Sequence, residues 1–124
     1  MDSPHDLRVL VVEDNLEVAE TLRNLLATCG FNVTVAHTSQ EGISAAREMT
    51  PHVVLCDIGL PDGDGYSFCT VLRQCQPTTS ARLIAVTGHA APIDRQRALA
   101  AGFDQHMAKP VNTDLLLREL AAAY

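Results

Sequence analysis

Short apolar runs typical of buried strands alternate with helical patterns five times, and this alternation constrains the fold more than any other feature of the chain. The predicted strands are residues 7–12, 32–36, 52–57, 82–87 and 105–108. A helix is predicted after each strand, at about 15–29, 38–50, 64–75, 92–102 and 112–124. Because every strand is followed by a helix, the strands are expected to run parallel, with helices on both faces of one sheet. The pattern therefore predicts an α/β fold with a five-stranded parallel sheet.

Local signals set the boundaries of these helices. Gly30 is a suitable stop for the first helix, and Thr38-Ser39-Gln40-Glu41 is typical of a capping box at the start of the second. Pro92 suits the first position of the fourth helix. The first helix is predicted to bury one apolar face, formed by Val18, Leu22, Leu25, Leu26 and Cys29.

Length and composition predict a single domain over residues 1–124, with a core at about 7–121. The net charge of −6 argues against a surface that binds nucleic acid. The sequence has neither an apolar stretch long enough for a membrane span nor a secretory signal, so we expect a cytoplasmic protein without membrane insertion. The four cysteines are interpreted as reduced packing thiols, and the scattered histidines do not have the spacing of zinc ligands.

Polar residues follow four of the five predicted strands at the point where each strand ends. Glu13 and Asp14 follow the first strand, Asp57 closes the third, Thr87 closes the fourth and Lys109 follows the fifth. In open parallel sheets the ligand site lies beyond the carboxyl ends of the strands. The fold is therefore expected to bring these five side chains to one edge.

Together these residue types suit the acceptance of a phosphoryl group. Three acids crowded together need a cation, and Mg²⁺ prefers oxygen ligands. Asp57 is the candidate nucleophile, Lys109 can neutralise developing charge, and the Thr87 hydroxyl can donate to a phosphoryl oxygen. Each residue alone has an ordinary interpretation, such as helix capping by acids or a strand preference of threonine. Their joint occurrence at the strand ends favours a common site.

These motifs resemble those of the receiver domains of two-component response regulators. The resemblance runs from Arg8 to about Leu120 and is carried by Val11-Val12-Glu13-Asp14-Asn15, Asp57 with Leu60-Pro61-Asp62-Gly63-Asp64-Gly65, Val86-Thr87-Gly88, and Ala101-Gly102-Phe103-Asp104 before Lys109-Pro110. It implies a flavodoxin-like sheet of strand order 2-1-3-4-5. It also implies phosphorylation of Asp57 by a histidine kinase or a histidine phosphotransfer protein. The domain would catalyse its own phosphoryl transfer and dephosphorylation without being an enzyme.

The resemblance also implies a role for each site residue. Asp14, Asp57 and the main-chain carbonyl of Gly59 would bind Mg²⁺ directly, and Glu13 would act through water. The Lys109-Pro110 bond would be cis, which proline permits. Gly59 and His89 occupy positions that tune dephosphorylation in the family.

A conformational switch would involve Thr87 and residue 106. At position 106 the family usually has Tyr or Phe, whereas this chain has His106. The sequence around His106 resembles that of receivers fused to hybrid histidine kinases. The expected contact face for a downstream protein is the fourth helix, fifth strand and fifth helix. Its fifth helix carries more apolar positions than one core stripe needs: Leu115, Leu116, Leu117 and Leu120.

Two other classes of function stay open at this stage. One is a receiver-shaped interaction module that never takes phosphate, although such modules usually lack the nucleophile or the lysine, and both are present here. The other is a phosphatase resembling the haloacid dehalogenases, which needs a second carboxylate two residues after the nucleophile, where this chain has Gly59. The sequence is compatible both with a free-standing regulator and with a domain of a hybrid kinase.

Overall fold

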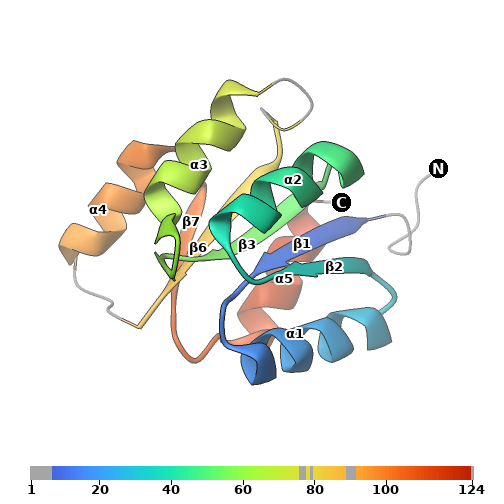
Figure 1. Ribbon diagram of the computed structural model, residues 1–124. Helices are drawn as coiled ribbons and strands as arrows, with labels where there is room; N and C mark the ends of the chain where they lie inside the picture. The colour runs from blue at the N-terminus through green and yellow to red at the C-terminus, as the bar shows by residue number, and fades with distance from the viewer. Residues whose placement is uncertain (1–6, 76–77, 79, 89–91, 124) are drawn as a thin grey trace.

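A computed structural model describes residues 7–75, 78, 80–88 and 92–123. Five parallel strands form one sheet in the order β2-β1-β3-β6-β7 (Figure 1). They are β1 (Arg8–Val12), β2 (Asn32–Ala36), β3 (Val53–Asp57), β6 (Arg82–Thr87) and β7 (Gln105–Ala108). Since β6 and β7 are the fourth and fifth strands of this sheet, the predicted flavodoxin-like order 2-1-3-4-5 is confirmed.

Helices cover both faces of the sheet (Figure 1). One face carries α1 (Leu16–Thr28) and α5 (Thr113–Ala123), and the other carries α2 (Ser39–Met49), α3 (Gly65–Gln74) and α4 (Pro92–Ala101). Successive side chains of a strand point to opposite faces, so β1 gives Leu10 and Val12 to one core and Val9 and Val11 to the other. Every residue of the central strand β3 is buried, as expected for a parallel strand covered on both sides.

The predicted apolar face of the first helix was partly wrong. Leu22 and Leu26 are buried as expected, but Val18 is 38% exposed and Cys29 is exposed. The buried stripe of α1 is narrower and runs through Ala19, Leu22 and Leu26. This stripe faces the sheet, and Val18 lies beside it on the helix surface.

A small hairpin that the sequence did not predict follows β3. Its strands are β4 (Gly59–Leu60) and β5 (Gly63–Asp64), which pair antiparallel. At the turn, the Asp62 carboxylate accepts hydrogen bonds from the backbone N–H groups of Gln40 (3.0 Å) and Ser39 (2.7 Å), and these bonds lower the pKa of Asp62. The hairpin is thereby tied to the first turn of α2, where a negative charge is favourable.

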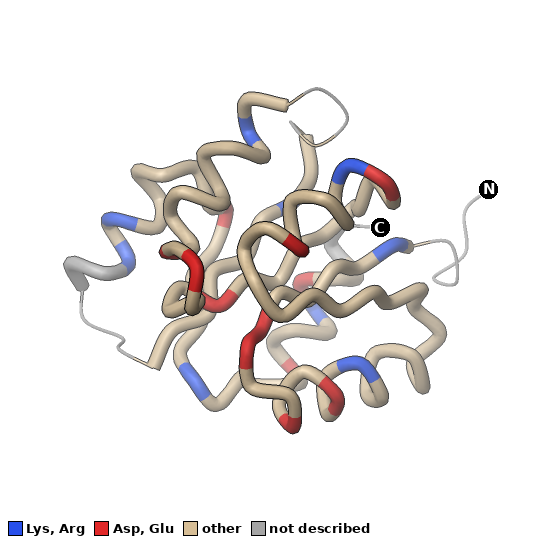
Figure 2. The backbone as a smooth tube through the Cα atoms, viewed as in Figure 1, with Lys and Arg blue, Asp and Glu red and all other residues tan. Residues whose placement is uncertain are grey.

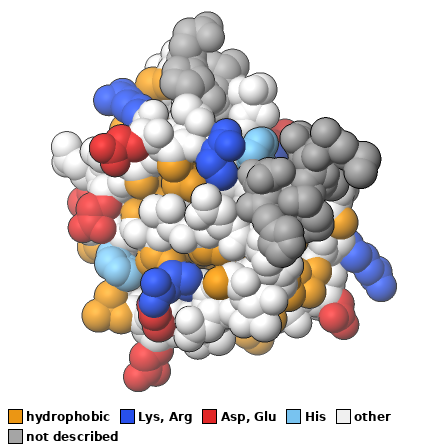
Figure 3. All heavy atoms as spheres, turned by 90° about the vertical axis from the view of Figure 1, so that its right-hand side faces the viewer, with side chains coloured by type: hydrophobic (Ala, Val, Ile, Leu, Met, Phe, Trp, Pro, Cys, Tyr) orange, Lys and Arg blue, Asp and Glu red, His pale blue; other side chains and the backbone are white. Residues whose placement is uncertain are grey.

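The two ends of the sheet differ in how charge is distributed. Figure 3 shows the end where β1 enters the sheet, and charged side chains of both signs are scattered there among polar and hydrophobic atoms. Figure 2 shows acidic segments side by side at the opposite end, where β1 and β3 stop. In the described part of the chain, no helix is long and apolar enough to cross a membrane.

Candidate functional site

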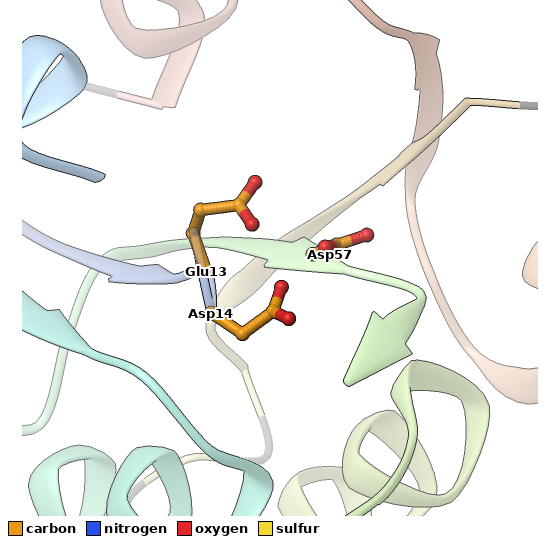
Figure 4. Close-up of side chains that lie close together, drawn as sticks. All are labelled: Glu13, Asp14 and Asp57. Carbon is orange, nitrogen blue, oxygen red and sulfur yellow. The ribbon is translucent and has the colours of Figure 1, made fainter. Parts of the chain in front are cut away.

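Three carboxylates meet where β1 and β3 end. Glu13 and Asp14 follow β1, and Asp57 is the last residue of β3. One carboxylate oxygen from each of the three lies within 4.8 Å of the others, and Figure 4 shows the Glu13 and Asp14 side chains extending toward the side where Asp57 lies. Glu13 and Asp57 are buried, whereas Asp14 is exposed and leaves the cluster open to water.

Lys109 brings one positive charge into this cluster. Its Nζ lies 3.0 Å from Asp57 Oδ2 and 3.2 Å from Glu13 Oε1. The Lys109-Pro110 peptide bond is cis, as the resemblance implied. The backbone N–H of Lys109 donates to the Thr87 carbonyl at 2.8 Å, which fixes the end of β7 against the end of β6.

Charge in the site is unbalanced, because three carboxylates lie together and the Lys109 ammonium group forms ion pairs with two of them, Glu13 and Asp57. Burial raises the pKa of Glu13, the Asn15 N–H opposes the rise, and the charge of Asp57 adds to it. Burial would lower the pKa of Lys109, but the hydrogen bond and charge of Asp57, with help from Glu13, raise it. The excess negative charge suits a divalent cation bound by oxygen ligands.

Two glycines, Gly59 and Gly65, contact Asp57 through their backbones. The N–H of Gly59 donates to Asp57 Oδ1 at 3.1 Å. Gly65, the first residue of α3, packs so closely that a Cβ there would lie 2.9 Å from the Asp57 carbonyl oxygen. Sequence reasoning missed this constraint, although the glycine stands within the motif Gly63-Asp64-Gly65 that was singled out.

The two predicted switch residues lie outside the acidic cluster. Thr87 is buried at the end of β6, next to Val86, which pairs with Asp57. His106 is half-buried on β7 and pairs with Ala85. Within the described residues, its Nε2 is buried and has no hydrogen-bond partner. His89, the other position expected to tune dephosphorylation, lies outside the described residues.

Because side chains alternate along β7, His106 points to the face opposite Met107. Met107 belongs to the core under α1 and α5, and Ala85 to the core under α2, α3 and α4. His106 therefore lies on the α4 side of the sheet. Thr87, two residues after Ala85, is directed to the same face.

Comparison with known proteins places the chain in a family. The model of the response regulator receiver domain matches residues 9–121. The KDP operon transcriptional regulatory protein KdpE of Escherichia coli is 35% identical over 115 residues, which cover 93% of this chain and 50% of KdpE. The cell cycle response regulator CtrA of Brucella ovis is 31% identical over 116 residues, covering 94% of this chain and 49% of CtrA. The chain thus spans about half the length of these two regulators.

Solved structures give the same result. A CheY-like response regulator receiver domain protein from Methanospirillum hungatei superposes with a TM-score of 0.84 at 30% identity, covering 94% of this chain and 95% of that one. The signal receiver domain of a DNA-binding response regulator from Colwellia psychrerythraea gives a TM-score of 0.88 at 25% identity, covering 94% and 97%. The chain belongs to the response regulator receiver domain family and is a phosphoacceptor receiver domain of two-component signalling.

Proposed function

We propose that Asp57 is the phosphoryl acceptor and that the donor is a phosphohistidine of a histidine kinase or a histidine phosphotransfer protein. The observation that supports this most is the setting of the Asp57 carboxylate, with Oδ1 held by the Gly59 N–H and Oδ2 by Lys109. In the transfer, an Asp57 oxygen forms a bond to phosphorus while the N–P bond of phosphohistidine breaks. The imidazole nitrogen keeps the electron pair and takes up a proton, and Asp57 becomes an acyl phosphate.

We also propose that the three carboxylates hold Mg²⁺. Asp14 and Asp57 would bind it directly together with the Gly59 carbonyl, and Glu13 would act through water. The exposure of Asp14 supports this assignment, because Mg²⁺ keeps several waters beside one or two carboxylates. When bound, Mg²⁺ supplies positive charge against the phosphoryl oxygens.

The remaining steps of the proposal concern this chain's own residues. The Lys109 ammonium group, which forms an ion pair with Asp57 in this structure, would contact a phosphoryl oxygen instead. The Thr87 hydroxyl would donate a hydrogen bond to another phosphoryl oxygen. These residues would make transfer and dephosphorylation self-catalysed. Because the nucleophile and the lysine are both present and in contact, a module that never takes phosphate is the less supported reading.

The proposed output is a protein contact on the face formed by α4, β7 and α5. Leu99 on α4 is 49% exposed and Leu115 on α5 is 37% exposed, which supports a partner surface there. The net charge of −6 supports an output without direct nucleic-acid contact.

We propose that the chain acts as a single domain with a core at about residues 7–121, in the cytoplasm. Both a free-standing regulator and a domain of a hybrid kinase stay compatible with the sequence.

Labelling with acetyl phosphate tests the acceptor. The wild-type protein with Mg²⁺ should gain one phosphoryl group by intact mass, and EDTA should abolish the gain. Asp57→Asn should gain none, whereas Asp114→Asn, a matched change at an exposed aspartate of α5, should label like the wild type. Equal labelling of Asp57→Asn and wild type would overturn the proposal.

A further inference from the structure

A polar pocket opens at the amino end of the sheet, where β1, β3 and β6 begin, opposite the end that carries Asp57 (Figure 3). Its volume is about 420 Å³, within the range of roughly 300–1,000 Å³ typical of small-molecule sites. No carboxylate is among the described residues that line it. Its polar lining residues are all at least partly exposed, so that a ligand can reach them: Arg8, Thr50, His52, Ser80 and Arg82.

Arg8 brings a positive charge that only neutral groups contact. Its Nε donates to the carbonyl oxygens of Met49 at 2.8 Å and Thr50 at 3.0 Å. Its Nη2 donates to the Thr50 carbonyl at 2.8 Å and to Thr50 Oγ1 at 3.2 Å. Within the described chain, the Nη1 group has no acceptor. The guanidinium is therefore held in place, while its charge and one of its nitrogens stay available to an anion.

Arg82 brings a second guanidinium, and one carboxylate contacts it. Its Nη2 forms an ion pair with Glu119 of α5, which is not a lining residue of the pocket. Its Nε has no hydrogen-bond partner among the described residues. Two guanidinium groups against one carboxylate leave excess positive charge at the pocket, although the whole chain has a net charge of −6.

His52 and Ser80 add neutral donors to the two guanidinium groups. His52 Nδ1 accepts a hydrogen bond from the backbone N–H of Arg8 at 2.9 Å, so the neutral ring carries its proton on Nε2, which is then a donor. Both His52 and Ser80 are exposed, and a serine hydroxyl can donate as well. These donors stand at the starts of three strands and approach a ligand from several directions. That arrangement suits the oxygens of a tetrahedral anion better than a planar carboxylate.

We propose that this pocket binds a phosphate group, either as the free ion or as the phosphate of a small monoester. Arg8 and Arg82 contact the phosphate oxygens through charge-assisted hydrogen bonds, and His52 and Ser80 donate to the remaining oxygens. The site is separate from Asp57 and takes phosphate as a ligand, without transfer of a phosphoryl group.

Titration with inorganic phosphate, followed by NMR, tests the site. It is carried out at constant ionic strength with EDTA, because the Asp57 site without Mg²⁺ stays negatively charged and disfavours phosphate. Saturable amide shifts should appear at Arg8, His52 and Ser80. Acetate should bind at least about threefold more weakly, the size of one exposed ion pair, because it has less charge and fewer oxygens. Equal affinities for the two anions, or no saturable shifts, would overturn the proposal.

Glycerol 3-phosphate separates the two sources of the phosphate group. Binding at least as tight as that of inorganic phosphate would identify a monoester as the ligand, and weaker binding would identify the free ion. No phosphoryl donor is present in either titration, so a failure to label Asp57 would leave these results unaffected.

Three variants locate the binding. Ser80→Glu places a carboxylate in the pocket from an exposed position and should abolish the saturable shifts. Ser67→Glu adds the same charge at an exposed position in the first turn of α3, outside the pocket lining, and should keep them. Glu119→Gln removes the carboxylate that competes for Arg82 and should tighten phosphate binding about threefold. Persisting shifts in Ser80→Glu, or unchanged affinity in Glu119→Gln, would overturn the proposal.

Discussion

At the scale of single residues, the excess of negative charge in the site has its effect on the pKa of Glu13. Its pKa is raised above the ordinary 4.5, first by burial and then by the charge of Asp57, against the opposing Asn15 N–H. The folded protein therefore binds this proton more tightly than the unfolded chain. Without metal, the contribution of Glu13 to the free energy of unfolding falls as the pH rises from 4.5 through the raised pKa. A bound cation offsets this cost.

Mg²⁺ binding should consequently weaken on going from about pH 7 to about pH 5, because Glu13 gains its proton earlier than an ordinary glutamate does. Glu13→Gln should bind Mg²⁺ more weakly at neutral pH and should show a flatter pH profile. Asp14→Ala should lose severalfold affinity at both pH values, because it removes one of the ligands proposed to bind Mg²⁺ directly. Calorimetric titration measures all three, and a Glu13→Gln profile as steep as that of the wild type would contradict this account.

The proximity of the polar residues, though not their roles, could be predicted where such a residue stands at the end of a strand. Glu13, Asp57 and Lys109 come together because parallel strands end at one edge, and that rule needs no knowledge of side-chain packing. The half-burial of His106 and its unpartnered Nε2 could not be predicted, because they depend on how α4 packs over β7.

At the scale of elements, the start of α3 is fixed by its approach to the site. The N–H of Gly65 donates to the Ile58 carbonyl at 2.9 Å, and a Cβ at 65 would meet both the Asp57 carbonyl oxygen and the Ile58 Cα at 2.9 Å. Both of these neighbours are backbone atoms, so they cannot rotate away as a side chain can.

Gly65→Ala should therefore destabilise the fold by about 1–3 kcal/mol, the usual cost of overpacking. Thermal unfolding measures the change. Gly88→Ala is the matched control, because a Cβ there meets no atom within 4 Å, and it should melt close to the wild type. Equal melting temperatures for the two variants would show that α3 can move away from Asp57 at no cost.

The main elements could be predicted because hydrophobic periodicity and helix stops are local signals. The β4–β5 hairpin could not, since its strands have two residues each. Its anchor is a pair of hydrogen bonds that Asp62 accepts from backbone N–H groups of α2, more than twenty positions earlier. The predicted face of α1 included Val18 because helical spacing does not reveal how wide the buried stripe is.

At the scale of the whole molecule, the phosphoacceptor and the proposed output face lie on different parts of one sheet. Thr87 and His106 are directed to the α4 side, while Lys109 pairs with both Glu13 and Asp57 at the carboxyl end of the sheet. A signal between them requires two states that the phosphoryl group stabilises differently, with a typical coupling of about 1–3 kcal/mol.

Beryllofluoride, which mimics the phosphoryl group, should shift amide resonances of α4, β7 and α5 as well as those near Asp57. Because His106 is smaller and more polar than the Tyr or Phe usual in the family, the shifts in β7 should be smaller than those of His106→Phe, which restores an aromatic side chain of that type. NMR shifts confined to the surroundings of Asp57 would argue against a switch through this face.

The central claim is that Asp57, and neither of its acidic neighbours, forms the acyl phosphate. Borohydride reduces an acyl phosphate to an alcohol, so treatment of the acetyl phosphate-labelled protein converts the modified aspartate to homoserine. Peptide mass mapping should find homoserine at position 57 and unmodified residues at 13 and 14. A reduced residue at 13 or 14, with Asp57 intact, would contradict the account.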